Sequence, residues 1–173
     1  IQARLFTDAP YFYSYVTNAG SAEIDGVEFS GEVRITPSLG FTTNATWQDA
    51  QLATFLPDTF AVGGGYPEGT TLPGSSKWSI ANTLRLEVAG RPGVPTFEVA
   101  HRYLSTAPVA FGNPAPAVRG NFNVFDLRTS IGIGDNFRVL AFVNNVFDKY
   151  GVLNAPFANQ FTPAGSIIRP RMY

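Results

Sequence analysis

The stretch from Ala22 to Thr36 reads AEIDGVEFSGEVRIT and alternates between apolar and polar side chains with a period of two. From Val27 onward the odd positions carry Val, Phe, Gly, Val and Ile, whereas the even positions carry Glu, Ser, Glu, Arg and Thr. Successive side chains of an extended strand point to opposite faces, so this pattern predicts a strand with one apolar and one polar face. Pro37 and Ser38 then end the pattern, as a short turn does.

The same alternation recurs along most of the chain, whereas the periodicity of a helix is hard to find. The pattern predicts six whole strands, at residues 22–36, 39–51, 76–88, 96–106, 122–133 and 137–147. The last of these is apolar on both faces, so the pattern leaves its orientation open. Two partial strands are expected at the chain ends, because Ile1 opens inside one strand and Tyr173 stands where another would begin.

The connections between these strands alternate in length. Short turns fall near 37–38, 90–95 and 134–136, whereas long segments rich in Gly, Pro and Asn fall near 53–75, 107–121 and 148–165. In an antiparallel meander, this rhythm puts all tight turns at one end of the sheet and all long loops at the other. Transmembrane β-barrels have this polarity, and soluble sandwiches have less reason for it.

The composition agrees with a sheet that has one apolar face. Charged residues make up 14 % of the 173 residues, against roughly 25 % in an ordinary soluble domain, and aromatic residues also make up 14 %. The net charge of −1 offers no basic field for nucleic acid. Cysteine is absent, which excludes disulfides, cysteine–zinc sites and a thiol nucleophile.

Residues that resemble catalytic or binding groups have simpler interpretations. The single histidine, His101, falls on the apolar row of its strand, where a local bulge would be needed to turn it inward. Gly63–Gly65 lacks the following Lys-Ser/Thr of a phosphate-binding loop and is interpreted as a loop tip. Asp8, Asp49 and Asp58 have no spacing that would pair them for acid–base chemistry. We therefore predict no catalytic residue, no cofactor and no metal site.

Four short motifs are more specific. The first is Asn18–Ala22 followed by Gly26-Val27-Glu28, and the second is Leu72–Ser79, which contains Trp78. The third is Phe142–Tyr150 with its Asn-Asn-Val-Phe-Asp-Lys-Tyr unit, and the fourth is Arg169–Tyr173 with its Arg-Pro-Arg unit. In order and rough spacing they resemble the carboxyl-terminal barrel of TonB-dependent receptors. The resemblance covers nearly the whole chain, and its last two motifs are the most specific.

The resemblance implies an all-β fold, namely an antiparallel up-and-down meander that forms part of a 22-stranded transmembrane β-barrel. Residues 1–173 would be a fragment of one barrel domain, with the plug domain and the final strand outside it. The implied location is the outer membrane of a Gram-negative bacterium. Open strand edges are not tolerated in lipid, so we expect that these residues alone neither insert nor transport.

The implied function is energy-coupled uptake of a scarce solute, with a ferric siderophore first and a cobalamin, a haem or a glycan as alternatives. The implied partners are outer-membrane lipid, the protein's own plug domain, the TonB complex acting through that plug, and the solute, but no nucleic acid. Loops on a rigid scaffold are the usual places for ligand contact. The candidates in the three long loops are Phe55, Phe60, Tyr66, Phe111, Arg119, Phe157, Asn159 and Gln160.

Two further sets of residues are assigned to the wall itself. The polar row is interpreted as a hydrated lumen wall with ion pairs, as a surface against the plug, or as both; it comprises Glu28, Glu32, Arg34, Arg85, Glu87, Glu98, Arg102, Asp126 and Arg128. Asn and Asp side chains end strands by bonding to nearby backbone, so the family-signature residues are expected to be structural. These are Asn144, Asn145, Phe147, Asp148, Tyr150, Pro170 and Arg171.

Three other classes of protein remain as alternatives. A passive outer-membrane channel would share the wall, but the Asn-Asn-Val-Phe-Asp and Arg-Pro-Arg units argue against it. A soluble β-sandwich that binds carbohydrate is disfavoured by the low charge and the segregated loops. A soluble β-rich enzyme is disfavoured because no catalytic constellation is visible.

Overall fold

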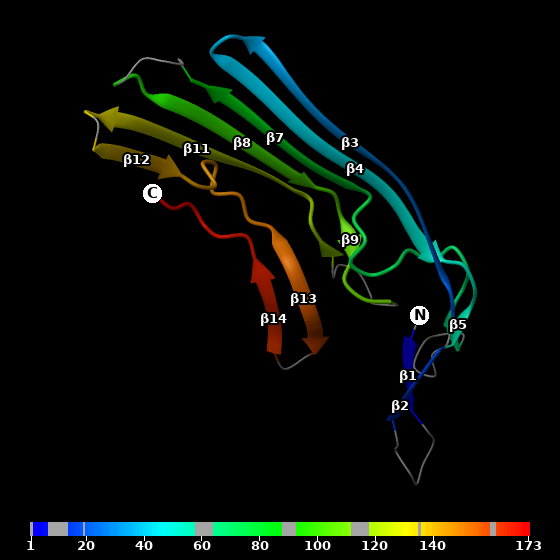
Figure 1. The fold of residues 1–173 in the computed structure, drawn as a ribbon. Helices are drawn as coiled ribbons and strands as arrows, with labels where there is room; N and C mark the ends of the chain where they lie inside the picture. Colours follow the sequence, from blue (N-terminus) through cyan, green and yellow to red (C-terminus); the bar gives the residue numbers. More distant parts are fainter. Residues whose placement is uncertain are drawn as a thin grey trace.

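The computed structural model describes residues 2–6, 14–18, 20–57, 64–87, 93–111, 118–134, 136–159 and 162–173. These residues form one curved, six-stranded antiparallel sheet with smaller hairpins attached (Figure 1). The strands of the sheet are β3 (Ala22–Thr36), β4 (Leu39–Leu52), β7 (Trp78–Leu86), β8 (Thr96–Leu104), β11 (Phe122–Ile133) and β12 (Phe137–Val143). Each pairs with its neighbour in chain order, so the predicted all-β meander of six whole strands is confirmed.

Four short hairpins lie at the end of the sheet away from the tight turns (Figure 1). They pair β1 (Gln2–Phe6) with β2 (Ser14–Asn18), β5 (Leu56–Pro57) with β6 (Gly65–Tyr66), β9 (Ala107–Pro108) with β10 (Val118–Arg119), and β13 (Val152–Asn159) with β14 (Thr162–Ile167). The last hairpin differs from the irregular loop predicted for 148–165. Its alternation is hidden in the sequence, because Pro156 interrupts it and the pairing shifts register twice.

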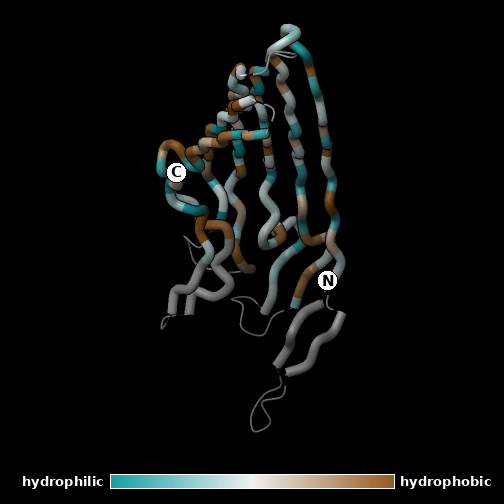
Figure 2. Tube along the Cα trace, turned by 60° about the vertical axis from the view of Figure 1, so that its left-hand side comes forward, coloured by the Kyte–Doolittle hydropathy of each residue, from teal (hydrophilic) through white to brown (hydrophobic). Residues whose placement is uncertain are grey.

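The register of the sheet aligns apolar side chains across all six strands. One row runs through directly paired positions from β3 to β12 and comprises Val33, Phe41, Leu84, Val99, Leu127 and Val143. Directly opposite residues of an antiparallel pair share a face, so this row marks one apolar face. Most of its members are exposed to solvent. Figure 2 shows hydrophobic and hydrophilic positions alternating along the long strands.

The opposite face is polar and concave. A second row, one residue along each strand, comprises Arg34, Gly40, Arg85, Glu98, Arg128 and Phe142. Figure 1 shows the carboxyl-terminal segment on the inner side of the curved sheet, and residues 167–169 line a concavity together with polar-face residues such as Arg102. The orientation of β12, which the sequence left open, follows from this register: Val143 faces outward and Phe142 inward.

The buried core of the described residues is small and lies at the long-loop end. Its apolar members are Ala50, Leu52, Leu56, Ala107, Phe122 and Val124. A single curved layer has no second sheet to cover its convex face, so large apolar side chains remain exposed there, such as Phe29, Val33 and Leu84. Among the described residues, no helix is long and apolar enough to cross a membrane.

Candidate functional site

Two of the long loops meet through an aromatic stack. The rings of Tyr66, in β6, and Phe111, just after β9, are stacked with centroids 5.1 Å apart and an interplanar angle of 24°. These residues are 45 positions apart in the sequence, so the contact joins the loop at 53–75 to the loop at 107–121. Aromatic pairs at this separation contribute about 0.5–1.5 kcal/mol beyond the area they bury.

Phe55 lies in the same loop as Tyr66, against the backbone of Gly65. A Cβ atom added at Gly65 would lie 2.5 Å from Cζ of Phe55 and would also meet the backbone oxygen of Leu56. The Phe55 ring therefore covers the backbone immediately before Tyr66, and only glycine leaves room for it there. Phe55 is 50 % exposed.

Arg119 lies beside the same loops. It pairs with Ala107 in the short β9–β10 hairpin, and its Nη1 atom lies 3.8 Å from where a Cβ of Gly74 would be. The backbone N–H of Gly74 donates to the oxygen of Pro108 at 2.8 Å, which ties the first loop to the second. The Nε atom of Arg119 is buried without a hydrogen-bond partner among the described residues.

The third loop joins the second through backbone. The N–H of Gly120 donates to the oxygen of Val152 at 2.9 Å, so β13 begins beside β10. Phe157 and Asn159 lie further along β13, whereas Phe60 and Gln160 lie outside the described residues. The structure therefore brings Tyr66 and Phe111 together, places Phe55 against the backbone of Gly65, and places Arg119 in the adjoining hairpin.

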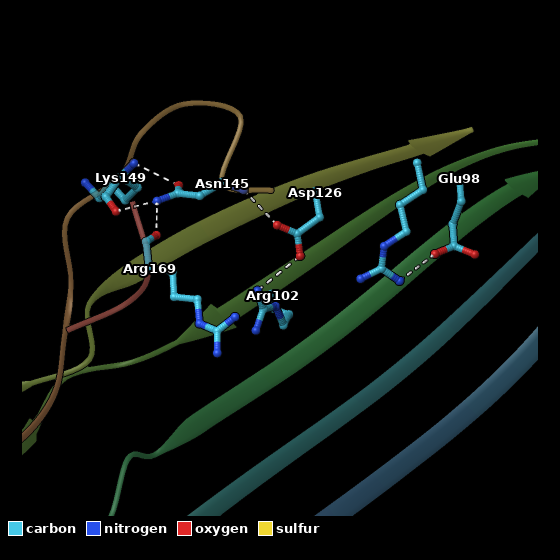
Figure 3. Close-up of polar contacts among 7 residues, drawn as sticks. Glu98, Arg102, Asp126, Asn145, Lys149 and Arg169 are labelled. Atoms are coloured by element: carbon cyan, nitrogen blue, oxygen red, sulfur yellow. Dashed lines mark hydrogen bonds and ion pairs between the residues drawn. The ribbon is translucent and has the colours of Figure 1, made fainter. Parts of the chain in front are cut away.

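A second organised region lies where β12 ends. Asn145 is 3 % exposed and has a left-handed backbone conformation, with φ of 51°. Its side-chain Nδ2 donates to the backbone oxygens of Lys149, at 3.0 Å, and Arg169, at 2.9 Å, while its Oδ1 accepts from the N–H of Lys149 at 2.8 Å (Figure 3). One side chain thus closes a tight turn and also holds the carboxyl-terminal segment.

Neighbours of Asn145 attach the same segment. Oδ1 of Asp148, whose φ is 50°, accepts from the N–H of Arg171 at 2.9 Å. Asn144 and Met172 exchange backbone hydrogen bonds of 2.9 and 3.2 Å. Phe147 lies edge-on to Phe125 at 5.5 Å, and it is exposed, as Tyr150 and Pro170 are. Asn and Asp tolerate left-handed backbone better than most residues, which explains why β12 ends at Val143 and not at the predicted 147.

Asp126 connects this turn to the sheet. Its Oδ1 accepts from the backbone N–H of Asn145 at 2.8 Å, and its Oδ2 lies 3.1 Å from Nη2 of Arg102 on β8. The sequence placed Arg102 and Asp126 on one face but did not pair them. The pairing needs the register, because Arg102 lies directly opposite Val124, two residues from Asp126. Among the described residues, the other ion pairs on this face are Arg128–Glu98 at 3.4 Å and Arg85–Glu87 at 2.8 Å.

His101 stays on the apolar face, because β8 shows continuous register with β7 and β11 and no bulge turns the side chain inward. Both ring nitrogens are hydrogen-bonded, Nδ1 with Nδ2 of Asn82 at 3.1 Å and Nε2 with Oδ1 of Asn123 at 3.0 Å. The imidazole also stacks on Phe125 with a centroid distance of 4.6 Å. We call His101, Asn82 and Asn123 the outward polar trio; its hydrogen bonds are internal.

Of the three aspartates considered for acid–base chemistry, Asp49 has side-chain partners and the other two lie outside the described residues. Lys77 Nζ lies 3.0 Å from Oδ1 of Asp49, and Gln51 Nε2 donates to Oδ2 of Asp49 at 2.8 Å. Asp8 and Asp58 are outside the described residues. Among the residues described, no group of three or more His, Cys, Asp or Glu side chains could hold a metal ion.

A curved antiparallel sheet with an apolar convex face, a polar concave face and all its long loops at one end is the wall of a β-barrel of the outer-membrane type. Comparison of the sequence with models of protein families identifies the family. The model of the TonB dependent receptor-like β-barrel family matches residues 2–146, and the chain belongs to that family.

One solved structure with the same fold is the ferric yersiniabactin uptake receptor FyuA from Yersinia pestis. The TM-score is 0.73 at 15 % sequence identity, and the alignment covers 91 % of this chain and 23 % of that one. This chain thus spans about a quarter of the length of FyuA, and the similarity concerns the fold. None of the proteins with curated functions matches the sequence significantly.

Proposed function

We propose that this chain is part of the barrel wall of a TonB-dependent receptor in the outer membrane of a Gram-negative bacterium. The receptor would bind a scarce solute at its long loops and import it with energy that the TonB complex delivers through a plug domain. In this proposal the chain catalyses no reaction. Its contribution is a lipid-facing wall, a polar inner wall and loops that contact the solute.

The observation that carries this proposal is the stack of Tyr66 on Phe111. It gathers two long loops into one partly exposed aromatic surface at the loop end of an amphipathic wall. Aromatic faces suit the planar rings of many siderophores and the apolar faces of sugars. FyuA, which has the same fold, is a ferric yersiniabactin uptake receptor, so a ferric siderophore is the first solute to test.

The test uses the full-length gene product that contains these residues, in cells without other siderophore receptors. Replacing both rings (Tyr66→Ala with Phe111→Ala) should weaken binding of the imported ferric siderophore tenfold or more, which corresponds to about 1.4 kcal/mol. The matched control is Phe137→Ala, which removes an exposed aromatic ring at the turn end of the sheet. This control should bind the siderophore normally. Equal binding by the double variant and the control would contradict the assignment of the loops.

Energy coupling is tested separately by measuring uptake with and without a functional TonB complex. A receptor of this kind should bind its solute in both cases but import it only with TonB. Uptake that persists without TonB and rises in proportion to external concentration would instead support the passive channel. Extraction of the protein without detergent would support the soluble carbohydrate-binding sandwich.

A further inference from the structure

A concavity of about 790 Å³ lies on the polar face, between the sheet and the carboxyl-terminal segment. Its floor includes the buried side chains of Phe122 and Val124 on β11, and Leu153 of β13 adds to the apolar lining. Three arginines also line it, namely Arg102, Arg128 and Arg169. We call this space the arginine concavity. It combines an apolar surface with several cationic groups in one hollow.

The charges lining the concavity are unbalanced. Asp126 is the one acidic residue among its lining residues, and its carboxylate is 7 % exposed and engaged with Arg102. The Arg102 side chain remains 62 % exposed although it makes that ion pair. Arg128 is 51 % exposed and pairs loosely, at 3.4 Å, with Glu98. Each guanidinium has five N–H donors, so both Arg102 and Arg128 can donate hydrogen bonds to a further anionic partner.

Arg169 is held over the same hollow by its backbone. Its carbonyl oxygen accepts from Nδ2 of Asn145 at 2.9 Å, which fixes the segment that carries it. Figure 3 shows its side chain extending from that anchor over the inner face of the sheet, on the side where Arg102 lies. Within the described part of the chain, no acidic group lies at ion-pair distance from the Arg169 guanidinium.

We propose that the arginine concavity binds a carboxylate-bearing organic molecule, with its carboxylate at Arg102 and Arg169 and its apolar body against Phe122 and Leu153. Guanidinium groups match carboxylates with two parallel hydrogen bonds, and a partly enclosed site strengthens the attraction between charges. This inference rests on the proposed function, because the molecule is taken to be the solute after it leaves the loops. It adds that the solute carries a negative group.

The test measures binding of 1-naphthoate and of its neutral analogue 1-naphthamide to the purified full-length protein in detergent, by calorimetry. The expected result is at least tenfold tighter binding of the carboxylate, with the difference shrinking as salt is raised. The double variant Arg102→Gln with Arg169→Gln should lose this preference. The matched control is Arg85→Gln, an arginine on the same face that lines a different hollow at the turn end and should leave the preference unchanged.

Further variants keep the result interpretable. Arg102→Lys with Arg169→Lys retains both charges and should keep part of the preference, and Arg169→Gln alone leaves the Arg102–Asp126 pair intact. Equal binding of naphthoate and naphthamide by the parent protein, or an unchanged preference in the double glutamine variant, would overturn the proposal. Siderophore uptake is not part of this readout, so the proposed function can fail while carboxylate binding succeeds, and the reverse.

Discussion

The buried carboxylate of Asp126 accepts the backbone N–H of Asn145 at 2.8 Å, and so a sheet residue on β11 holds the turn that follows β12. The other oxygen of Asp126 faces Arg102 on β8. The turn holds Arg169 in its place through the Asn145 side chain. One carboxylate therefore links β11, β8 and the turn after β12, and this turn holds the carboxyl-terminal segment.

Replacing Asp126 by alanine should destabilise the full-length protein by about 1–3 kcal/mol, because the buried N–H of Asn145 loses its acceptor. Asp126→Asn should cost less, because its amide oxygen can still accept that bond while the charge facing Arg102 is lost. The measurement is thermal unfolding in detergent, followed by circular dichroism. If the two variants unfold at the same temperature, the ion pair and not the backbone bond carries the effect.

Asn145 is the second place where this turn can be tested. Asn145→Ala removes three side-chain hydrogen bonds, for about 3 kcal/mol at roughly 1 kcal/mol each, and also strains a backbone with φ of 51°. Asn145→Gly removes the same bonds but permits that backbone, so it should be less harmful by about 1 kcal/mol. Protease sensitivity near Arg169 and Arg171 should rise in both variants. If the carboxyl-terminal segment stays protected in both variants, the Asn145 side chain does not hold it.

Much of the wall could be predicted from sequence, because its signal is local. Alternation alone gave β11 both of its bounds, and it placed His101 correctly on the apolar face. The sequence could not show that Asn82 lies directly opposite His101. Such a pairing depends on register, which depends on the lengths of the turns.

The contacts between the loops could not be predicted from the sequence, for a different reason. Tyr66 and Phe111 were both named as candidates, but nothing in the chain fixes which loop residues meet. The approach of Arg169 to the sheet is set by hydrogen bonds from Asn145, which were not visible as a pattern. The β13–β14 hairpin was missed because Pro156 and two register shifts remove the alternation that revealed the other strands.

The outward polar trio gives a third prediction. His101→Ala should leave Asn82 and Asn123 without their partner on an apolar face, at a cost of about 1–3 kcal/mol in thermal stability. Replacing all three together, with His101→Leu, Asn82→Val and Asn123→Val, removes the polar groups and should restore much of that loss. If the triple variant is the least stable of the set, the outward polar trio stabilises the protein by more than the hydrogen bonds among its three members. A wall variant such as Thr43→Val, in the same row, serves as the matched control.

Gly151 offers the most direct test of how the carboxyl-terminal hairpin sits on the sheet. It is buried, and a Cβ atom there would lie 2.6 Å from Cδ1 and 3.0 Å from Cγ of the Phe122 ring. Gly151→Ala should therefore destabilise the protein by about 1–3 kcal/mol through overpacking. Combining it with Phe122→Leu should recover part of that loss, since the smaller side chain makes room. The two substitutions would then be non-additive, as expected for residues in contact.

Gly64 provides the matched control for that cycle, because a Cβ added there has open space, although its φ of 76° adds strain. Gly64→Asn tolerates such a backbone and should leave stability nearly unchanged. Additive losses for Gly151→Ala and Phe122→Leu would mean that the backbone at Gly151 does not rest on the Phe122 ring.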